Sequence, residues 1–221
     1  MLPPGLPTDQ KRHNLDPGLQ HALEQATQDL TKKGFTQLRD LFSPAETASL
    51  RAEAQALHRE EKLIPAKVGR GRERIQDLGQ RNDSTLWWKE TPETEAQALV
   101  FERWNQIREH LNRSLFLGLK DFEAHWAIYP VGGFYRKHID RFREDDARIL
   151  SAVLYLNPPD WKAVDGGALR VWPEGLEGSE CEPIEIQPLG GSMALFLSDR
   201  IPHEVLPTNR IRYSVAAWFR R

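Results

Sequence analysis

Three residues in the C-terminal half are suited to binding a divalent metal ion together. His138 and Asp140 lie two positions apart in YRKHID, which reads as a β-strand, so their side chains project from one face. His203 opens a second strand-like segment, HEVLP. Two histidines and one carboxylate form the facial triad that leaves positions open on non-haem Fe(II), although manganese fits the same ligands. A His-x-Asp by itself is more often a surface histidine beside a solvated carboxylate, so the metal-site interpretation depends on His203.

Arg212 follows His203 by nine residues, in the strand-like segment RYSVAAWF. Alternation along a strand places Ser214, Ala216 and Trp218 on the same face as Arg212. A cation, two small residues and a wide aromatic ring suit a pocket for a dicarboxylate, because arginine binds carboxylates through two parallel hydrogen bonds. The alternative interpretation is an ordinary salt bridge of Arg212 at the rim of the fold.

The segments that must position these residues read as short strands. After residue 120, eight apolar runs rich in β-branched and aromatic residues follow one another, separated by Pro, Gly and Asp. With no helical pattern between them, they predict a jelly-roll or a barrel. The runs are FEAHWAIYP, FYRKHID, ILSAVLYLN, GALRVWP, PIEIQP, SMALFLS, HEVLP and RYSVAAWF.

Helical patterns precede these strands. Apolar residues recur at helical spacing after Pro17, and Ser43, Pro44 and Glu46 form a strong helix start with a capping box. Helices are therefore predicted over 17–33, from Ser43 to about Lys62 and from Thr91-Pro92 through Leu111, with a strand over 34–42.

These elements predict an α+β protein with one domain. Its core is a double-stranded β-helix (jelly-roll) over 120–221, and the helices of a supporting region, 17–119, pack on one of its sheets. Residues 1–16 are rich in Pro, Gly and polar groups and read as a loose N-terminal arm. The segment 65–80 is a long, basic, glycine-punctuated loop, and loops of that length in a compact domain are usually functional or disordered.

Composition excludes several classes of protein. The 221 residues carry 30 Lys and Arg against 32 Asp and Glu, a net charge of −2, which argues against a nucleic-acid partner. A single cysteine, Cys181, excludes a disulfide framework and a cysteine-rich metal site. No apolar run approaches the roughly 20 residues of a membrane helix, and the first residues lack an apolar signal core. The sequence therefore favours a cytoplasmic protein with no membrane partner.

The strand motifs together resemble the 2-oxoglutarate- and Fe(II)-dependent oxygenases. The similarity is greatest to the prolyl 4-hydroxylases typified by the animal oxygen-sensing enzymes and their bacterial relatives. It covers about residues 120–220 well and the preceding helices and loop more loosely. The motifs that carry it are AIYPVGGFYRKHID, VLYLNPPDW, GGALRVWPEG and FLSDRIPHEVLPTNRIRYSVAAWF.

The resemblance implies a role for each matching residue. His138, Asp140 and His203 match the iron ligands, and Arg212 matches the residue that binds the distal carboxylate of 2-oxoglutarate. The remaining matches line the cosubstrate pocket: Tyr155 supporting that carboxylate, Tyr129 near the metal, and Val153, Leu169, Ala216 and Trp218 as walls. Ala216 departs from the threonine of the animal enzymes, which leaves the cosubstrate one hydrogen bond fewer.

The resemblance also implies a loop that folds over the substrate, here from Lys67 to about Asp83. Arg81, Asp83 and Trp87 match the end of that loop, and Asp83 with Arg148 matches a pair that ties it to the barrel. The alternative is a solvated basic loop whose arginines, among them Arg70, Arg72 and Arg74, only keep it soluble.

The implied activity is hydroxylation of a prolyl residue in a protein substrate, an elongation factor Tu-type protein in bacterial relatives. Fe(II), 2-oxoglutarate and O2 are the implied cofactor and cosubstrates, with ascorbate as a stimulant. Two alternatives stay open: the same chemistry on a free amino acid or small metabolite, and a jelly-roll binding module with a silent metal site. The long charged loop favours a chain-like substrate, because sites for small molecules are usually concave and largely apolar.

Overall fold

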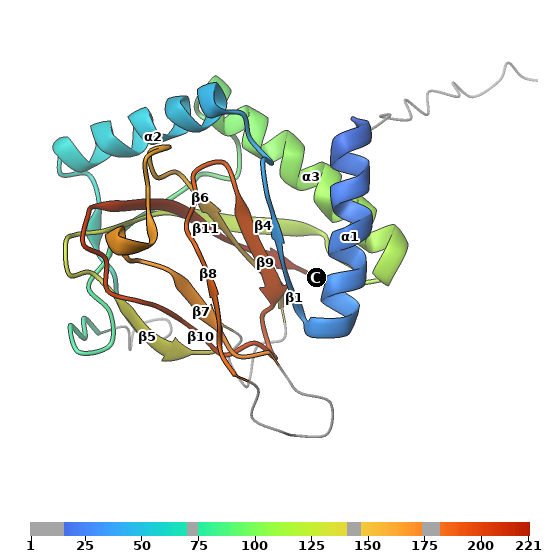
Figure 1. The fold of residues 1–221 in the computed structure, drawn as a ribbon. Helices are drawn as coiled ribbons and strands as arrows, with labels where there is room; N and C mark the ends of the chain where they lie inside the picture. Colours follow the sequence, from blue (N-terminus) through green and yellow to red (C-terminus); the bar gives the residue numbers. More distant parts are fainter. Residues whose placement is uncertain (1–15, 70–74, 141–146, 174–181) are drawn as a thin grey trace, which may run out of the picture.

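The computed structural model describes residues 16–69, 75–140, 147–173 and 182–221. The predicted N-terminal arm, except Asp16, and the arginines of the loop at 70–74 lie outside these residues. Three helices pack beside two antiparallel sheets (Figure 1). Among the described residues the helices are α1 (Pro17–Lys33), α2 (Pro44–Arg59) and α3 (Glu95–Leu115), and a 3-10 turn lies at Ala163–Asp165.

Each helix begins at a side-chain cap. In α2 the predicted capping box forms, since Ser43 accepts from the Glu46 backbone N–H and Glu46 accepts from that of Ser43. The helix ends at Arg59, short of the predicted Lys62. The predicted start of α3 at Thr91-Pro92 is wrong, because Thr94 caps it by accepting from the Gln97 N–H. None of the described helices combines the length and apolar character that crossing a membrane requires.

The larger sheet has the strand order β1-β9-β6-β11-β4-β3-β2, and the smaller has β5-β10-β7-β8. Each of the eight strand-like runs predicted after residue 120 contains one strand, β4 to β11. The larger sheet consists of β1 (Phe35–Leu38), β2 (Ile64–Pro65), β3 (Ser84–Trp87), β4 (Asp121–Tyr129), β6 (Arg148–Tyr155), β9 (Met193–Leu197) and β11 (Arg212–Arg220). The smaller consists of β5 (Tyr135–His138), β7 (Leu169–Val171), β8 (Ile184–Ile186) and β10 (His203–Val205).

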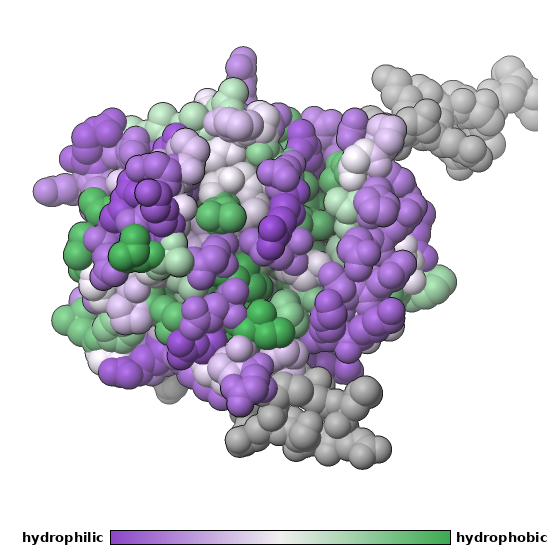
Figure 2. Space-filling model, in the orientation of Figure 1, coloured by the Kyte–Doolittle hydropathy of each residue, from purple (hydrophilic) through white to green (hydrophobic). Residues whose placement is uncertain are grey.

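Alternating side chains of the larger sheet supply two separate cores. One face packs against the helices, with Trp104, Trp126 and Phe219 among the buried residues. The other face packs against the smaller sheet, with Phe196 meeting residues such as Val171. The helices thus cover one sheet from outside, as predicted, and α1 and α3 present a mostly hydrophilic surface (Figure 2).

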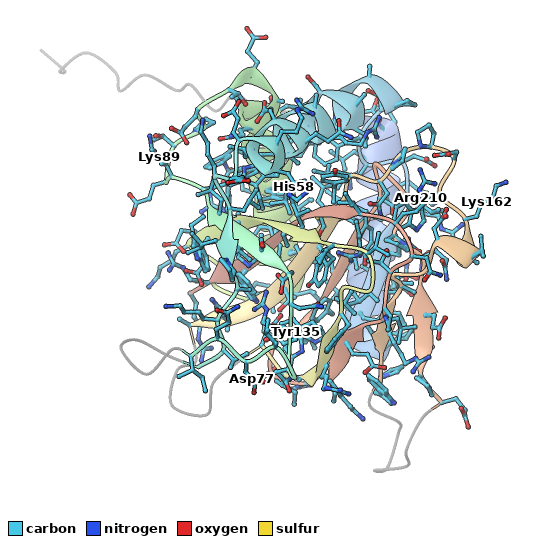
Figure 3. The ribbon with its side chains drawn as sticks, turned by 90° about the vertical axis from the view of Figure 1, so that its left-hand side faces the viewer. His58, Asp77, Lys89, Tyr135, Lys162 and Arg210 are labelled. Atoms are coloured by element: carbon cyan, nitrogen blue, oxygen red, sulfur yellow. The ribbon has the colours of Figure 1, made fainter. Side chains whose placement is uncertain are left out.

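The larger sheet also takes strands from the supporting region. β1, β2 and β3 all precede residue 120, and β3 pairs with β4 in antiparallel register. The larger sheet therefore combines three strands from the supporting region with four strands from the predicted core. Tyr135 and Asp77 lie at the end of the two sheets that is far from His58 on α2 (Figure 3), and this end contains the site described next.

Candidate functional site

Pairing of β5 with β10 brings His138 and His203 together, because the register places them directly opposite each other. Asp140, two residues beyond β5, reaches both rings. Its Oδ1 lies 3.5 Å from His138 Nε2 and its Oδ2 lies 3.5 Å from His203 Nε2. One ligand atom from each of the three residues lies within 4.8 Å of the others. The predicted metal ligands form one cluster.

Backbone carbonyl groups fix how the two histidine rings are protonated. His138 Nδ1 lies 2.7 Å from the Arg136 carbonyl oxygen, and His203 Nδ1 lies 3.0 Å from that of Ile201. A carbonyl oxygen only accepts, so each Nδ1 carries the proton and donates it. Burial lowers the pKa of His203 to about 4, which keeps that ring neutral near pH 7. A neutral ring protonated at Nδ1 has its lone pair on Nε2, toward Asp140.

Two serines hold the carboxylate of Asp140. Ser151 Oγ donates to Asp140 Oδ2 over 2.7 Å, and Ser198 Oγ lies 2.9 Å from Ser151 Oγ. Since the Ser151 proton points to the carboxylate, Ser198 is the donor in the second bond. Burial alone raises the pKa of Asp140, but His203, His138 and the Ser151 hydrogen bond together hold it well below its usual range.

The donor set fits a divalent metal ion. Nε2 of each histidine faces an oxygen atom of the Asp140 carboxylate over 3.5 Å, and a neutral imidazole protonated at Nδ1 directs the Nε2 lone pair toward it. Electron-rich groups in this arrangement repel one another unless a cation lies among them. Imidazole and carboxylate ligands with hydrogen-bonded outer partners are typical of Fe(II), Mn(II) and Zn(II) sites.

Arg212 is fully buried with part of its guanidinium group unpaired. Its Nε donates to the Gly167 carbonyl oxygen and its Nη1 to Ser214 Oγ, each over 2.9 Å. A Cβ on Gly167 would lie 2.9 Å from Arg212 Cδ, so only glycine permits this approach. Within the described part of the chain, Nη2 has no hydrogen-bond partner, and the hydroxyl of Tyr155, whose ring centre lies 5.2 Å from Arg212 Cζ, has none either.

These two open donors fit a bound carboxylate. Burying a guanidinium without a counter-charge is costly, and among the described residues no carboxylate pairs with Arg212. Burial raises the pKa of the Tyr155 hydroxyl, so it stays protonated as a donor. The structure thus favours the dicarboxylate pocket over the alternative of a rim salt bridge.

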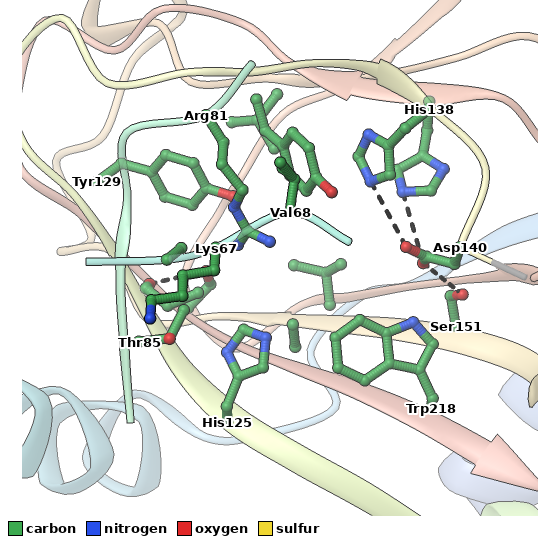
Figure 4. A pocket seen from close by; sticks show the side chains of 18 of the residues that line it. Lys67, Val68, Arg81, Thr85, His125, Tyr129, His138, Asp140, Ser151 and Trp218 are labelled. Atoms are coloured by element: carbon green, nitrogen blue, oxygen red, sulfur yellow. Dashed lines mark hydrogen bonds and ion pairs between the residues drawn. The ribbon is translucent and has the colours of Figure 1, made fainter. Parts of the chain in front are cut away.

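A cavity of about 540 Å³ is lined by the three residues of the metal cluster and by Arg212. Its volume lies within the range of small-molecule sites. Figure 4 shows Asp140 and His138 at one side of it, with Arg81 and Tyr129 at another. Tyr155 is fully buried with its ring centre 5.2 Å from Arg212 Cζ, and it does not itself line the cavity. The predicted wall residues that do line the cavity are Tyr129, Val153, Leu169, Ala216 and Trp218.

The end of the predicted loop contacts a metal-cluster histidine through one aromatic ring. The Arg81 guanidinium lies 4.1 Å above the Tyr135 ring, and the Tyr135 ring stacks on His138 with centroids 3.6 Å apart. Burial raises the pKa of Tyr135 to about 12, so its hydroxyl is protonated at physiological pH. Arg81 thus contacts the metal cluster indirectly, through the ring of Tyr135.

The expected pair between Asp83 and Arg148 is wrong. Asp83 instead accepts two hydrogen bonds from Arg81, Nε to Oδ1 over 2.7 Å and Nη2 to Oδ2 over 2.6 Å. Arg148 donates to Glu123 over 2.7 Å, and its guanidinium lies 3.9 Å above the Trp218 ring. Arg81 pairs with a carboxylate two residues away in the chain, whereas Arg148, at the start of β6, reaches across β11 to Glu123 on β4. Arg148 thus fixes a cavity wall, Trp218, rather than the loop.

Several residues around the cavity were not predicted from the sequence. Tyr135, Ser151 and Ser198 contact the metal-cluster residues, and His125 lines the cavity beside Trp218. Strand alternation is the pattern that could have identified two of them, His125 and Ser151. His125 shares a face of β4 with Tyr129, and Ser151 shares a face of β6 with Tyr155.

Comparison with known proteins places this geometry in context. Residues 124–220 match a family model described as the 2OG-Fe(II) oxygenase superfamily. Egl nine homolog 1 from Homo sapiens is 30% identical over 92% of this chain and 47% of its own length. The chain thus spans about half the length of that curated relative.

Solved structures extend the match to nearly the whole chain. A prolyl-4-hydroxylase from Pseudomonas putida is 38% identical, with a TM-score of 0.78, and the match covers 90% of this chain and 98% of that one. A prolyl hydroxylase from Trichoplax adhaerens, in complex with a hypoxia inducible factor peptide fragment, has a TM-score of 0.81 at 22% identity, covering 92% of this chain and 90% of that one. At that identity the second match shows a common fold alone.

Proposed function

The chain belongs to the 2OG-Fe(II) oxygenase superfamily, whose members use Fe(II), 2-oxoglutarate and O2, and from this premise we propose that it hydroxylates a prolyl residue of a protein substrate. One observation carries the proposal. A single cavity joins the His138–Asp140–His203 cluster to Arg212, whose buried guanidinium keeps one nitrogen unpaired. The fold that holds them is, in this proposal, the jelly-roll of the superfamily, with residues 17–221 acting as one domain.

Each part of the site has a separate task. His138, Asp140 and His203 hold the iron, and Ser151 keeps the carboxylate directed at it. Arg212 and Tyr155 bind the distal carboxylate of 2-oxoglutarate, while Val153, Leu169, Ala216 and Trp218 exclude water beside it and Tyr129 lines the metal side. The bound metal and cosubstrate supply the oxidation: 2-oxoglutarate takes one atom of O2 and becomes succinate and CO2, and the other atom enters a substrate C–H bond.

The mouth of the cavity supports a polypeptide substrate. Ile64, Trp87 and Ile139 line the cavity and are 60%, 40% and 46% exposed. Exposed apolar side chains gathered at a site typically mark a contact surface for another molecule. They suit a chain that lies across the opening better than a small solute held inside it. The bacterial structure at 38% identity is a prolyl-4-hydroxylase, which favours proline as the target.

Formation of succinate tests the proposal against its alternatives. The enzyme with Fe(II), 2-oxoglutarate and ascorbate receives proline-containing peptides, among them fragments of an elongation factor Tu-type protein and of the hypoxia inducible factor degradation domain. We expect one class of peptide to raise succinate formation well above the peptide-free rate, and the His138→Ala variant to show no response. Stimulation by a free amino acid or metabolite alone would favour the small-molecule alternative. No turnover under any condition would favour the silent binding module.

A further inference from the structure

His125 lines the side of the cavity formed by β3 and β4. In the antiparallel register it lies opposite Trp87 of β3 and opposite Ala216 of β11, and Ala216 in turn lies opposite Val153 of β6. Directly opposite residues project from the same face of a sheet, so the four side chains form one row across the cavity floor. Ala216 has the smallest side chain of the four and therefore leaves a depression in the cavity floor between His125 and Val153.

One nitrogen of His125 has a fixed partner and the other has none among the described residues. Nδ1 lies 2.9 Å from the Trp126 carbonyl oxygen, which only accepts, so Nδ1 carries the proton and donates. Burial lowers the pKa of His125 to about 4, so the ring is neutral near pH 7. Nε2 therefore presents a lone pair, and Figure 4 shows the ring projecting into the cavity beside Trp218.

Two indole rings hold the imidazole in this orientation. Trp87 meets it edge to face with centroids 4.9 Å apart, and Trp218 lies 5.3 Å away. A ring fixed between aromatic neighbours and a backbone hydrogen bond loses little entropy when it accepts another hydrogen bond. His125 is thus a preorganised acceptor rather than a core residue with its polar atoms satisfied.

The surroundings of His125 select the kind of donor. Arg81 and Arg148 disfavour its protonated form while Asp83 favours it, and each arginine already has a carboxylate partner. Burial is the larger effect, and it also disfavours a charged lysine or arginine side chain of a ligand as the donor. A neutral N–H, of which every non-proline residue of a polypeptide carries one on its backbone, incurs no such penalty.

We propose that Nε2 of His125 accepts a hydrogen bond from a backbone N–H of the substrate polypeptide and thereby sets the register of the target proline. The inference rests on the proposed function. From His125 across Ala216 to Val153 is two strand spacings, about 10 Å, and an extended chain covers about 3.3 Å per residue. Ser151, which binds Asp140, and Tyr155 flank Val153 on the same face, so Val153 marks the side of the cavity where the metal and the target proline lie. The amide that His125 would bind therefore lies about three residues from that proline.

The first experiment compares three variants on the best peptide found in the succinate assay. His125→Leu removes the acceptor at similar size, and His125→Gln restores an acceptor. We expect the KM for the peptide to rise about three- to tenfold in His125→Leu, the range of one net hydrogen bond, with a smaller change in kcat and partial recovery in His125→Gln. His110→Leu is the matched control, because His110 bonds to Thr27 and Ser114 on the helices, away from the cavity.

A second experiment does not depend on any substitution folding well. Single backbone N-methyl groups are placed in turn at each amide within five residues of the target proline. Wild-type enzyme should lose affinity about three- to tenfold at one amide near the third residue, and His125→Leu should be insensitive to methylation there.

The two experiments separate failure of this inference from failure of the proposed function. If wild-type enzyme hydroxylates the peptide but no single N-methyl group acts through His125, the inference is wrong and the function stands. If wild-type enzyme hydroxylates no proline-containing polypeptide, the proposed function fails and this inference fails with it.

Discussion

At the scale of single residues, the carboxylate of Asp140 is held by contacts with three side chains. His138 and His203 approach its two oxygen atoms from one side, and Ser151 fixes one of them by a hydrogen bond of 2.7 Å. Outer hydrogen bonds of this kind orient a ligand before the metal arrives. We therefore expect the serine to contribute to metal affinity without touching the metal.

Replacing Ser151 tests this role. Ser151→Ala removes the donor to Asp140 Oδ2 and leaves Ser198 without its partner. We expect the affinity for Fe(II) or Mn(II) to fall by roughly 10- to 100-fold, measured by competition with a metal-binding dye. Ser192→Ala, a buried serine that donates to the Leu189 carbonyl oxygen instead, is the control. Equal metal affinities in the two variants would contradict the role given to Ser151.

Arg212 makes a second residue-scale prediction, about the cosubstrate. Arg212→Lys keeps the charge but loses the planar fork, so the KM for 2-oxoglutarate should rise at least tenfold, about 1.4 kcal/mol. Tyr155→Phe should raise it less. Arg210→Lys is the matched control two residues away, since Arg210 pairs with Asp160 and Asp165 at the surface. A normal KM in Arg212→Lys would show that the carboxylate binds elsewhere.

At the scale of elements, the segment that leads into β3 connects the larger sheet to the metal cluster. Arg81 and Asp83 form a buried pair in which the Arg81 side chain is 12% exposed and that of Asp83 is 0% exposed. The same arginine covers Tyr135, which stacks on His138. The pair therefore anchors the end of the predicted loop to the metal cluster.

Breaking this pair should destabilise the protein. Asp83→Asn leaves the Arg81 guanidinium buried without a counter-charge, which typically costs about 3–5 kcal/mol in the free energy of unfolding. Urea denaturation followed by tryptophan fluorescence measures the loss. Asp77→Asn, in the same segment, is the control because its carboxylate is exposed and accepts only from the Gly79 N–H among the hydrogen bonds described. Equal stability of both variants would mean that the loop end is not anchored through Asp83.

The strand pattern predicted more of these elements than of their contacts. Alternation and turn residues identified β4 to β11, because a half-buried strand imposes a period of two on its own sequence. β2 and β3 were not predicted, because they lie at either end of the basic segment 65–80, which reads as a loop, and they pair with each other only in the folded sheet. The partner of Asp83 was predicted incorrectly, since two arginines were available and only the fold decides which one lies closer.

At the scale of the whole molecule, the two faces of the larger sheet divide stability from function. One face packs on the helices, where Trp104 and Trp126 are buried, and the other holds the cavity between the two sheets. Metal ligands come from one sheet, and Arg212 comes from the other. His138, Asp140, His203 and Arg212 could be recognised in the sequence because each lies in a distinctive motif. The acceptor role of His125 could not, because it depends on neighbours from three strands.

The fate of molecular oxygen tests the central claim most directly. The enzyme, Fe(II) and 2-oxoglutarate are incubated with the stimulating peptide under ¹⁸O2, and the peptide is sequenced by mass spectrometry. The account predicts one ¹⁸O atom on a single prolyl residue, with one succinate formed for each hydroxylated peptide, and neither product from His138→Ala. Succinate formed without oxygen on proline, or oxygen on a different residue, would contradict it.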